Sequence, residues 1–182
     1  MSVFFHTLRC DAARLSQRKP DEIGVIHLLM KLVNPRFLPV FLIRLAAAVW
    51  RHTLFKPFGL LLTWLNLLLF GVECTPRCQI GPGLMLPHTS GTVIGAVSIG
   101  TNATIFQGVT LGAREADLGF TAETRPEVGD NVIIGAGAKV LGGIKLGNGS
   151  QIGANAVVIE NVPENGVAVG IPAKVVKVLD NV

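Results

Sequence analysis

The stretch from Val128 to Pro163 reads VGDNVI-IGAGAK-VLGGIK-LGNGSQ-IGANAV-VIENVP, and an aliphatic residue opens every unit of six. An amphipathic helix would repeat every 3.6 residues and an ordinary strand every two, so a period of six excludes both. Such a period predicts a parallel β-helix with three short strands per coil. The aliphatic residues would then stack inside a triangular prism, with small residues at the corners.

The same count extends upstream and breaks at two places. It runs through Cys74, Ile80 and Leu86, and again through Val93, Ile99, Ile105 and Leu111. The step from Leu86 to Val93 has one residue too many and contains His88, the only histidine in the last two thirds of the chain. The step from Leu111 to Val128 is long enough to leave a polar loop at about 113–126. Long loops on rigid scaffolds are often functional, so both breaks are candidate parts of a site.

Composition narrows the class of protein. The chain has 182 residues, of which 49% are hydrophobic and 15% charged, which excludes a disordered chain. A net charge of +4 suits an anionic cofactor or a membrane surface, and no basic run or aromatic platform points to nucleic acid. Cys74 and Cys78 fall at inward positions of one repeat, so with Cys10 we expect three reduced thiols in a cytoplasmic protein.

Residues 1–70 are expected to form an N-terminal helical region. The first fifteen residues lack the features of a signal peptide. The stretch 58–72 carries no charge, but it is shorter than the roughly 20 residues that span a bilayer. We therefore expect a helix buried against protein, with peripheral contact of residues 37–72 with the inner face of the membrane as the alternative. Residues 174–182 are expected to form a tail.

Five motifs occur in a family order: GVECTP, IGPGLMLPHTSG, QGVTLG, IGAGA and GIPAK. In them the chain resembles the left-handed β-helix acyltransferases, in particular the serine acetyltransferase-like branch and the related exopolysaccharide O-acetyltransferases. The resemblance implies a mainly β fold, a left-handed parallel β-helix over 71–173 after the helical extension. It also implies acetyl-CoA as the acyl donor, no metal, and a homotrimer or dimer of trimers.

The resemblance assigns roles to individual residues. His88 would be the general base that takes the proton of the acceptor hydroxyl, which suits an imidazole that is partly neutral at pH 7. Glu73 stands where the family has an aspartate that orients this histidine, and it is one methylene longer. The donor would lie between neighbouring prisms, at positions that match Gly112, Ala136, Ala154, Lys139 and Lys174.

The acceptor is the least determined part of the prediction. Serine acetyltransferases usually carry Asp before the catalytic histidine and Arg-His before the last proline of the loop. This chain has Pro87, and Thr124 with Arg125, at those positions. Since the charged partners of an amino acid differ, we expect the neutral hydroxyl of a sugar, polysaccharide precursor or lipid-linked oligosaccharide. The alternative acceptor is serine, giving O-acetylserine for cysteine synthesis.

Two other classes of protein share the prism. A γ-class carbonic anhydrase needs three zinc-binding histidines, whereas His6, His27 and His52 fall outside the β-helix and only His88 falls within it. A noncatalytic β-helix that serves in assembly would leave the break at His88 and the retained motifs without explanation.

Overall fold

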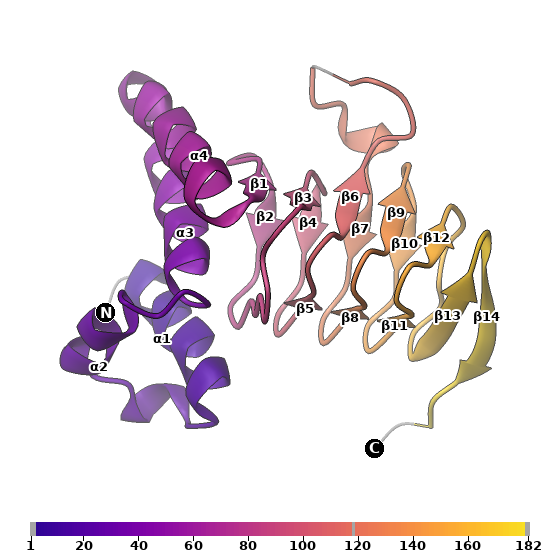
Figure 1. Ribbon diagram of the computed structural model, residues 1–182, viewed down its shortest axis with the longest axis horizontal. Coiled ribbons are helices and arrows are strands. Elements are labelled where there is room, and N and C mark those ends of the chain that lie inside the picture. Colours follow the sequence, from indigo (N-terminus) through magenta and orange to yellow (C-terminus); the bar gives the residue numbers. More distant parts are fainter. Residues whose placement is uncertain (1–2, 118, 181–182) are drawn as a thin grey trace.

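The computed structural model describes residues 3–117 and 119–180 and shows a helical region at one end of an elongated prism (Figure 1). The helical region comprises α1 (Val3–Ser16), the 3-10 helix η1 (Pro20–Glu22), α2 (Val25–Lys31), α3 (Leu38–Trp50), the 3-10 helix η2 (Thr53–Phe55) and α4 (Lys56–Phe70). Gly71 ends α4 in the left-handed conformation, with φ of 68°, and the prism begins at the next residue.

Three sheets form the faces of the prism, and each of the inner coils contributes one strand to each face. Sheet A contains β1 (Val72–Cys74), β3 (Thr92–Ile94), β6 (Thr110–Gly112), β9 (Lys139–Leu141) and β12 (Val157–Val158). Sheet B contains β2 (Gln79–Ile80), β4 (Ser98–Ile99), β7 (Glu127–Val128) and β10 (Lys145–Leu146). Sheet C contains β5 (Thr104–Ile105), β8 (Ile133–Ile134), β11 (Gln151–Ile152), β13 (Gly166–Gly170) and β14 (Ala173–Val178).

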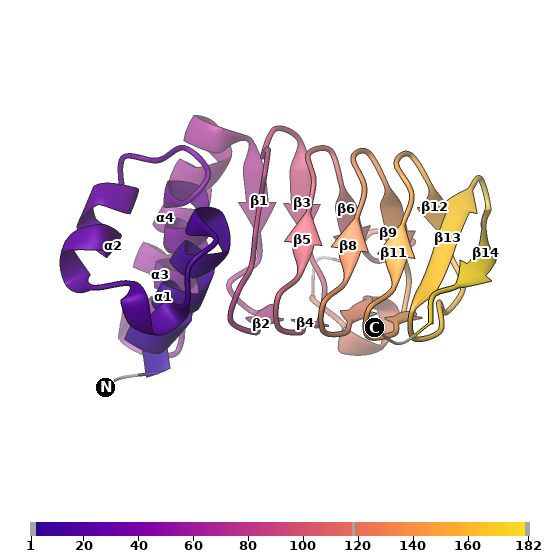
Figure 2. The same cartoon turned by 90° about the horizontal axis from the view of Figure 1, so that it is seen from below.

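All strand pairs of these sheets are parallel except β13 with β14, which confirms the predicted left-handed parallel β-helix. Figure 2 shows the coils following one another along the prism axis. The chain passes from sheet C to sheet A at one edge of the prism and from sheet A to sheet B at another. We call these the C–A edge and the A–B edge.

The aliphatic positions of the repeat form the core of the prism. Val128, Ile134, Val140, Leu146, Ile152 and Val158 are all buried. Cys74 and Cys78 are free thiols buried in the same core. Burial raises the pKa of Cys74 well above its usual value and that of Cys78 to about 12, so both remain protonated packing groups.

One inward position predicted from the count is wrong. In β3 it is Ile94, 1% exposed and in register with Leu111, that faces the core, while Val93 points outward. The step from Leu86 to Ile94 is therefore eight residues, so the corner that holds His88 has two extra residues rather than one. The following step, from Ile94 to Ile99, is one residue shorter than the regular six.

An ion pair joins the helical region to the first coil. Asp11 of α1 and Arg44 of α3 lie 2.9 Å apart, and both are buried. The Asp11 carboxylate accepts hydrogen bonds from the backbone amides of Gly83 and Leu84. Arg44 donates to the carbonyl oxygens of Ile80 and Gly81. The pair thus satisfies backbone groups that have no preceding coil to bond. Burial raises the pKa of Asp11, and Arg44 and the two amides oppose that rise.

Two segments differ from the sequence prediction. The apolar stretch predicted to be buried forms α4, but only Gly59 and Asn66 of this helix are buried. A run of apolar residues shows that a helix has an apolar surface. It does not show whether another part of the protein buries that surface, and this explains the error. Residues 174–178 of the predicted tail belong to β14, which pairs antiparallel with β13.

Candidate active site

The C–A edge is formed by stacked corners whose backbones are hydrogen-bonded from coil to coil. The amide of Gly108 donates to Ser90, that of Gly137 to Gln107 and that of Asn155 to Ala136. The chain therefore stacks Ser90, Gln107 and Ala136 in one column, with Ala154 in the next corner. Ala136 is half-buried and Ala154 exposed. Small side chains in such a column leave backbone groups accessible to a ligand.

His88 lies at the same edge, in the lengthened corner that leads into β3. Its side chain is exposed, and the preceding Pro87 is half-buried. The ring of His88 has no hydrogen-bond partner among the described residues. In the next coil at this edge, the side-chain oxygen of Gln107 is buried and has no hydrogen-bond partner within the described part of the chain. The edge thus combines a free imidazole with an unsatisfied hydrogen-bond acceptor.

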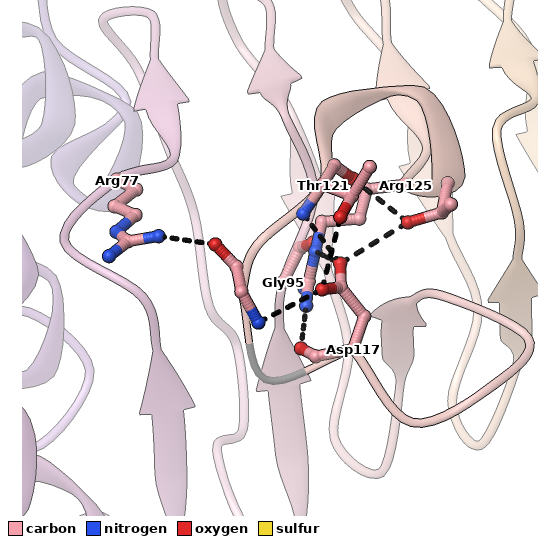
Figure 3. A network of polar contacts seen from close by, with 7 residues as sticks. Arg77, Gly95, Asp117, Thr121 and Arg125 are labelled. Carbon is pink, nitrogen blue, oxygen red and sulfur yellow. Dashed lines mark hydrogen bonds and ion pairs between the residues drawn. The ribbon is translucent and has the colours of Figure 1, made fainter.

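The A–B edge carries the loop between β6 and β7, which contains the 3-10 helix η3 (Ala122–Thr124). Asp117 organises this loop (Figure 3). Its carboxylate accepts hydrogen bonds from the backbone amides of Gly119 and Thr121 and from the hydroxyl of Thr124. Partial desolvation favours a raised pKa of Asp117, but the Thr121 amide and the Arg125 guanidinium outweigh it and hold this pKa below its usual value.

Arg125 fastens the loop to the prism. Its Nε lies 3.0 Å from the Asp117 carboxylate, its Nη1 donates to the carbonyl oxygen of Gly95, and its Nη2 donates to the carbonyl oxygen of Asp117. Phe120 has φ of 61°, in the left-handed region that a bulky side chain rarely adopts. Its ring lies between two guanidinium groups, 4.5 Å from Arg125 and 5.7 Å from Arg77. The contacts of Asp117 and Arg125 hold this strained conformation in place.

A cavity of about 250 Å³ lies under the loop. Its floor is the outer face of sheet A, at Val93 and Thr110, and its charged lining groups are Glu73, Arg77, Asp117 and Arg125. The volume lies below the range of roughly 300–1,000 Å³ that holds drug-sized ligands. The cavity therefore fits a small molecule or one end group of a larger one.

The predicted site residues divide between the two edges. Glu73 on β1 and Gly112 on β6 line the cavity under the loop, whereas His88, Ala136 and Ala154 belong to the C–A edge. No hydrogen bond joins Glu73 to His88 among the described contacts. Since three residues of strand span about 10 Å, a ligand lying across sheet A can touch both edges.

The predicted lysines and loop residues have partners within the chain. Lys139 lies on sheet A and donates to the carbonyl oxygen of Gly108 and the hydroxyl of Thr110. Lys174 on β14 pairs with Glu160 at 3.4 Å, and both side chains are exposed. The hydroxyl of Thr124 is bonded within the loop, like the guanidinium of Arg125.

Four residues that the sequence analysis did not select also form this region: Arg77, Gln107, Asp117 and Phe120. Asp117 had a local signal, because an aspartate two residues before a glycine in a polar loop commonly bonds the following backbone. Gln107 opens the QGVTLG motif. Arg77 had no signal of its own, since its position follows from contacts with α3 and the loop.

Residues 125–160 match the family described as bacterial transferase hexapeptide (six repeats). A serine acetyltransferase of Staphylococcus aureus (strain Mu50) is 48% identical over 108 residues, which are 59% of this chain and 49% of that protein. The chain thus spans about half the length of the curated relatives it matches.

Solved structures match over a larger share of the chain. Neisseria gonorrhoeae serine acetyltransferase in complex with serine has a TM-score of 0.79 at 30% identity, over 96% of this chain and 69% of that one. A serine acetyltransferase in complex with CoA has a TM-score of 0.74 at 32% identity, over 93% of this chain and 68% of that one. Fold and repeat together define a hexapeptide-repeat transferase. Within that class, the chain belongs to the serine acetyltransferase family.

Proposed function

We propose that the protein is an acetyl-CoA-dependent serine O-acetyltransferase. The observation that carries this proposal is the division of the site around sheet A. One edge offers the imidazole of His88 beside a column of small side chains, and the other covers a small charged cavity. Relatives of this family have been solved with serine and with CoA, which supports the same pair of substrates here.

The C–A edge fits the acyl donor. The small side chains of Ala136 and Ala154 let a pantetheine chain approach the backbone of these corners. Lys139 and Lys174 remain the proposed partners of the phosphates, each by exchanging its present contact for a phosphate oxygen. Gly112 lines the acceptor cavity, so we assign it to the region where the acetyl group meets the acceptor.

The acceptor oxygen is made nucleophilic by proton removal. The free imidazole of His88 takes the proton as the hydroxyl oxygen attacks the thioester carbonyl. The tetrahedral intermediate then expels the thiolate of CoA, which receives the proton from His88, so the products are the acetyl ester and free CoA. Glu73, on the strand beside β3, is the proposed carboxylate partner that stabilises the imidazolium.

A second candidate acceptor is the sugar hydroxyl expected from the sequence. That expectation rested on Pro87, Thr124 and Arg125, which differ from the pattern of serine enzymes. Thr124 and Arg125 are hydrogen-bonded to Asp117, so their identity reflects how this loop is built. Pro87 alone still favours a changed acceptor. The relatives and the small cavity favour serine over a polysaccharide precursor.

We further propose that the site is completed by a second copy of the chain, in a trimer or dimer of trimers. The outer face of sheet A is a shallow floor, and a serine under the loop is too short to cross it to His88 of the same chain. The His88 that deprotonates this serine would therefore belong to the neighbouring prism. The test offers acetyl-CoA with serine or with a panel of neutral and acidic sugars and follows the release of free thiol. Serine should exceed every sugar in kcat/KM, and a sugar that exceeds serine by tenfold or more would overturn the serine assignment.

A further inference from the structure

We propose that Arg77 binds the carboxylate of the acceptor and so makes the enzyme select an amino acid. This inference rests on the proposed serine acetyltransferase activity and assigns its specificity to a residue outside the motifs that resemble the family. The argument begins from the two guanidinium groups of the cavity, because a zwitterionic acceptor needs one cation for its carboxylate.

Every guanidinium nitrogen of Arg125 is already engaged in a contact that holds the loop. All three of its guanidinium nitrogens donate to Asp117 or Gly95, at distances of 2.8–3.0 Å. A carboxylate bound there would have to share nitrogens that already hold the loop over the cavity. Arg125 is therefore a structural residue of this site.

Arg77 has donors to spare. Its Nη1 donates to the carbonyl oxygen of Gly119 at 2.8 Å, and among the described residues its Nε and Nη2 have no hydrogen-bond partner. These two nitrogens form one side of the planar guanidinium group, and that pair of parallel donors matches the two oxygens of a carboxylate. Figure 3 shows Arg77 reaching from the first coil toward the loop.

Two aromatic rings orient this guanidinium before any ligand binds. Its central carbon lies 5.7 Å from the Phe120 ring and 5.9 Å from the ring of Trp50 at the end of α3. A group held between two rings loses little freedom on binding, so a bidentate contact becomes more favourable. The strained backbone conformation of Phe120 thus places its ring where it can orient the guanidinium of Arg77.

The charge of the cavity distinguishes a carboxylate from a phosphate. Glu73 lines the same cavity as Arg77, and no ion pair joins the two among the described residues. A doubly charged phosphate would face the Glu73 carboxylate, whereas a zwitterion also brings an ammonium group. The chemistry of the cavity therefore favours a small amino acid over a phosphorylated sugar.

The experiment compares Arg77→Met with the wild-type protein on serine and on serinamide, in which a neutral amide replaces the carboxylate. We expect kcat/KM for serine to fall by about 10- to 100-fold in the variant, mainly through KM. Serinamide turnover and the KM for acetyl-CoA should change by less than about threefold. Arg77→Lys should recover part of the loss, since it keeps the charge without the bidentate geometry.

Arg114→Met is the matched control. Arg114 fastens the far side of the loop to the carbonyl oxygens of Leu141 and Ile159 and does not line the cavity. Loss of loop order should lower turnover of both acceptors equally, and such a pattern for Arg77→Met would overturn the carboxylate assignment. A wild-type protein that releases thiol with sugars and not with serine would overturn the proposed function itself and the role of Arg77 with it.

A second inference comes from the uncovered face of α4. This helix exposes a series of large apolar side chains: Phe58, Leu60, Leu61, Trp64, Leu65, Leu67, Leu68 and Leu69. Its window Thr53–Phe70 has the length and composition of a membrane span, with mean hydropathy 1.5, but only 11% of it is buried. Between Glu22 and Glu73 the chain has no acidic residue and five Lys or Arg.

We infer that α4 lies on the surface of an anionic bilayer. A Cβ at Gly59 would lie 3.2 Å from the carbonyl oxygen of Ala46, and Asn66 donates to Pro39, so one side of α4 is held closely against α3. A helix fixed in this way presents one apolar face rather than crossing the membrane. Lys56 and Arg51, exposed near its start, complement anionic headgroups.

Sedimentation with vesicles tests this inference. The wild-type protein should sediment with vesicles of equal parts phosphatidylcholine and phosphatidylglycerol and much less with phosphatidylcholine alone. Trp64→Glu combined with Leu68→Glu should lower the bound fraction at least fivefold, whereas Val176→Glu on β14 should not. Wild-type protein that stays in the supernatant would overturn the inference. So would a double variant that loses an oligomer in lipid-free solution, because a second copy of the chain would then cover this face.

Discussion

The two edges of sheet A differ in how they are built. The C–A edge consists of repeated corners, with backbone hydrogen bonds between coils, small side chains and one lengthened corner at His88. The A–B edge leaves the repeat between β6 and β7, where a loop presents charged side chains held by the Asp117 network. A regular edge suits a long, extended ligand that bonds to backbone. An irregular loop suits a small ligand recognised by its charges. The comparison predicts that substitutions at the two edges have separable effects on donor and acceptor.

The largest expected effect is on catalysis at the C–A edge. His88→Ala should lower kcat by about 10²- to 10⁴-fold, because the acceptor hydroxyl would lose its general base. Circular dichroism and the affinity for CoA should stay unchanged, since the side chain is exposed. Ser90→Ala, in the same corner, is the control and should retain activity within about threefold. Near-normal turnover of His88→Ala would remove this histidine from the mechanism.

A smaller loss is expected from the loop. Asp117→Ala removes the acceptor for Gly119, Thr121 and Arg125, so the roof of the cavity should lose its order. We expect kcat/KM for the acceptor to fall by about 10- to 100-fold, with the KM for acetyl-CoA within about twofold of wild type. Steady-state kinetics with each substrate varied in turn separates the effect on the acceptor from the effect on acetyl-CoA. Equal increases in both KM values would contradict the division between the edges.

A bulky side chain in the column of corners at the C–A edge should impair binding of the donor and leave binding of the acceptor unchanged. Ala154→Trp should raise the KM for acetyl-CoA by about tenfold and leave the KM for the acceptor unchanged, because the indole would cover the backbone of that corner. Glu164→Trp, an exposed position outside both edges, provides the control. An Ala154→Trp variant with unaltered donor kinetics would show that the donor lies elsewhere.

The smallest effect concerns pH. The folded-state pKa of Asp117 is lowered, so its network contributes fully above the unfolded pKa of about 4 and is lost as pH falls through the folded value. Amide hydrogen exchange at Thr121 should therefore accelerate, relative to the prism amides, only in strong acid. Asp117→Asn should show fast exchange at this amide without that pH dependence. Equal protection of wild type and variant at pH 6 would mean that the carboxylate does not order the loop.

The sequence predicted the prism well because one residue in six repeats a single inward position, from Val128 to Val158. It failed at Val93 because successive side chains in a strand point to opposite faces, and a corner of unknown length can shift the register by one. Only the pairing of Ile94 with Leu111 decides which residue faces inward. His88 was found because it lies in that corner. Arg77 was not, because Trp50 and Phe120 meet it from distant parts of the chain.

The ion pair between Asp11 and Arg44 also bears on self-association. A stack of parallel coils contains no internal signal to stop, and the open end of its first coil presents unpaired amides and carbonyls that could template the end of another prism. Here the Asp11 carboxylate and the Arg44 guanidinium form hydrogen bonds with four of those backbone groups. At the far end, β14 reverses direction beside β13 and closes that side of sheet C to a parallel neighbour. The ion pair at one end and β14 at the other thus limit the length of the prism and oppose end-to-end association into fibres.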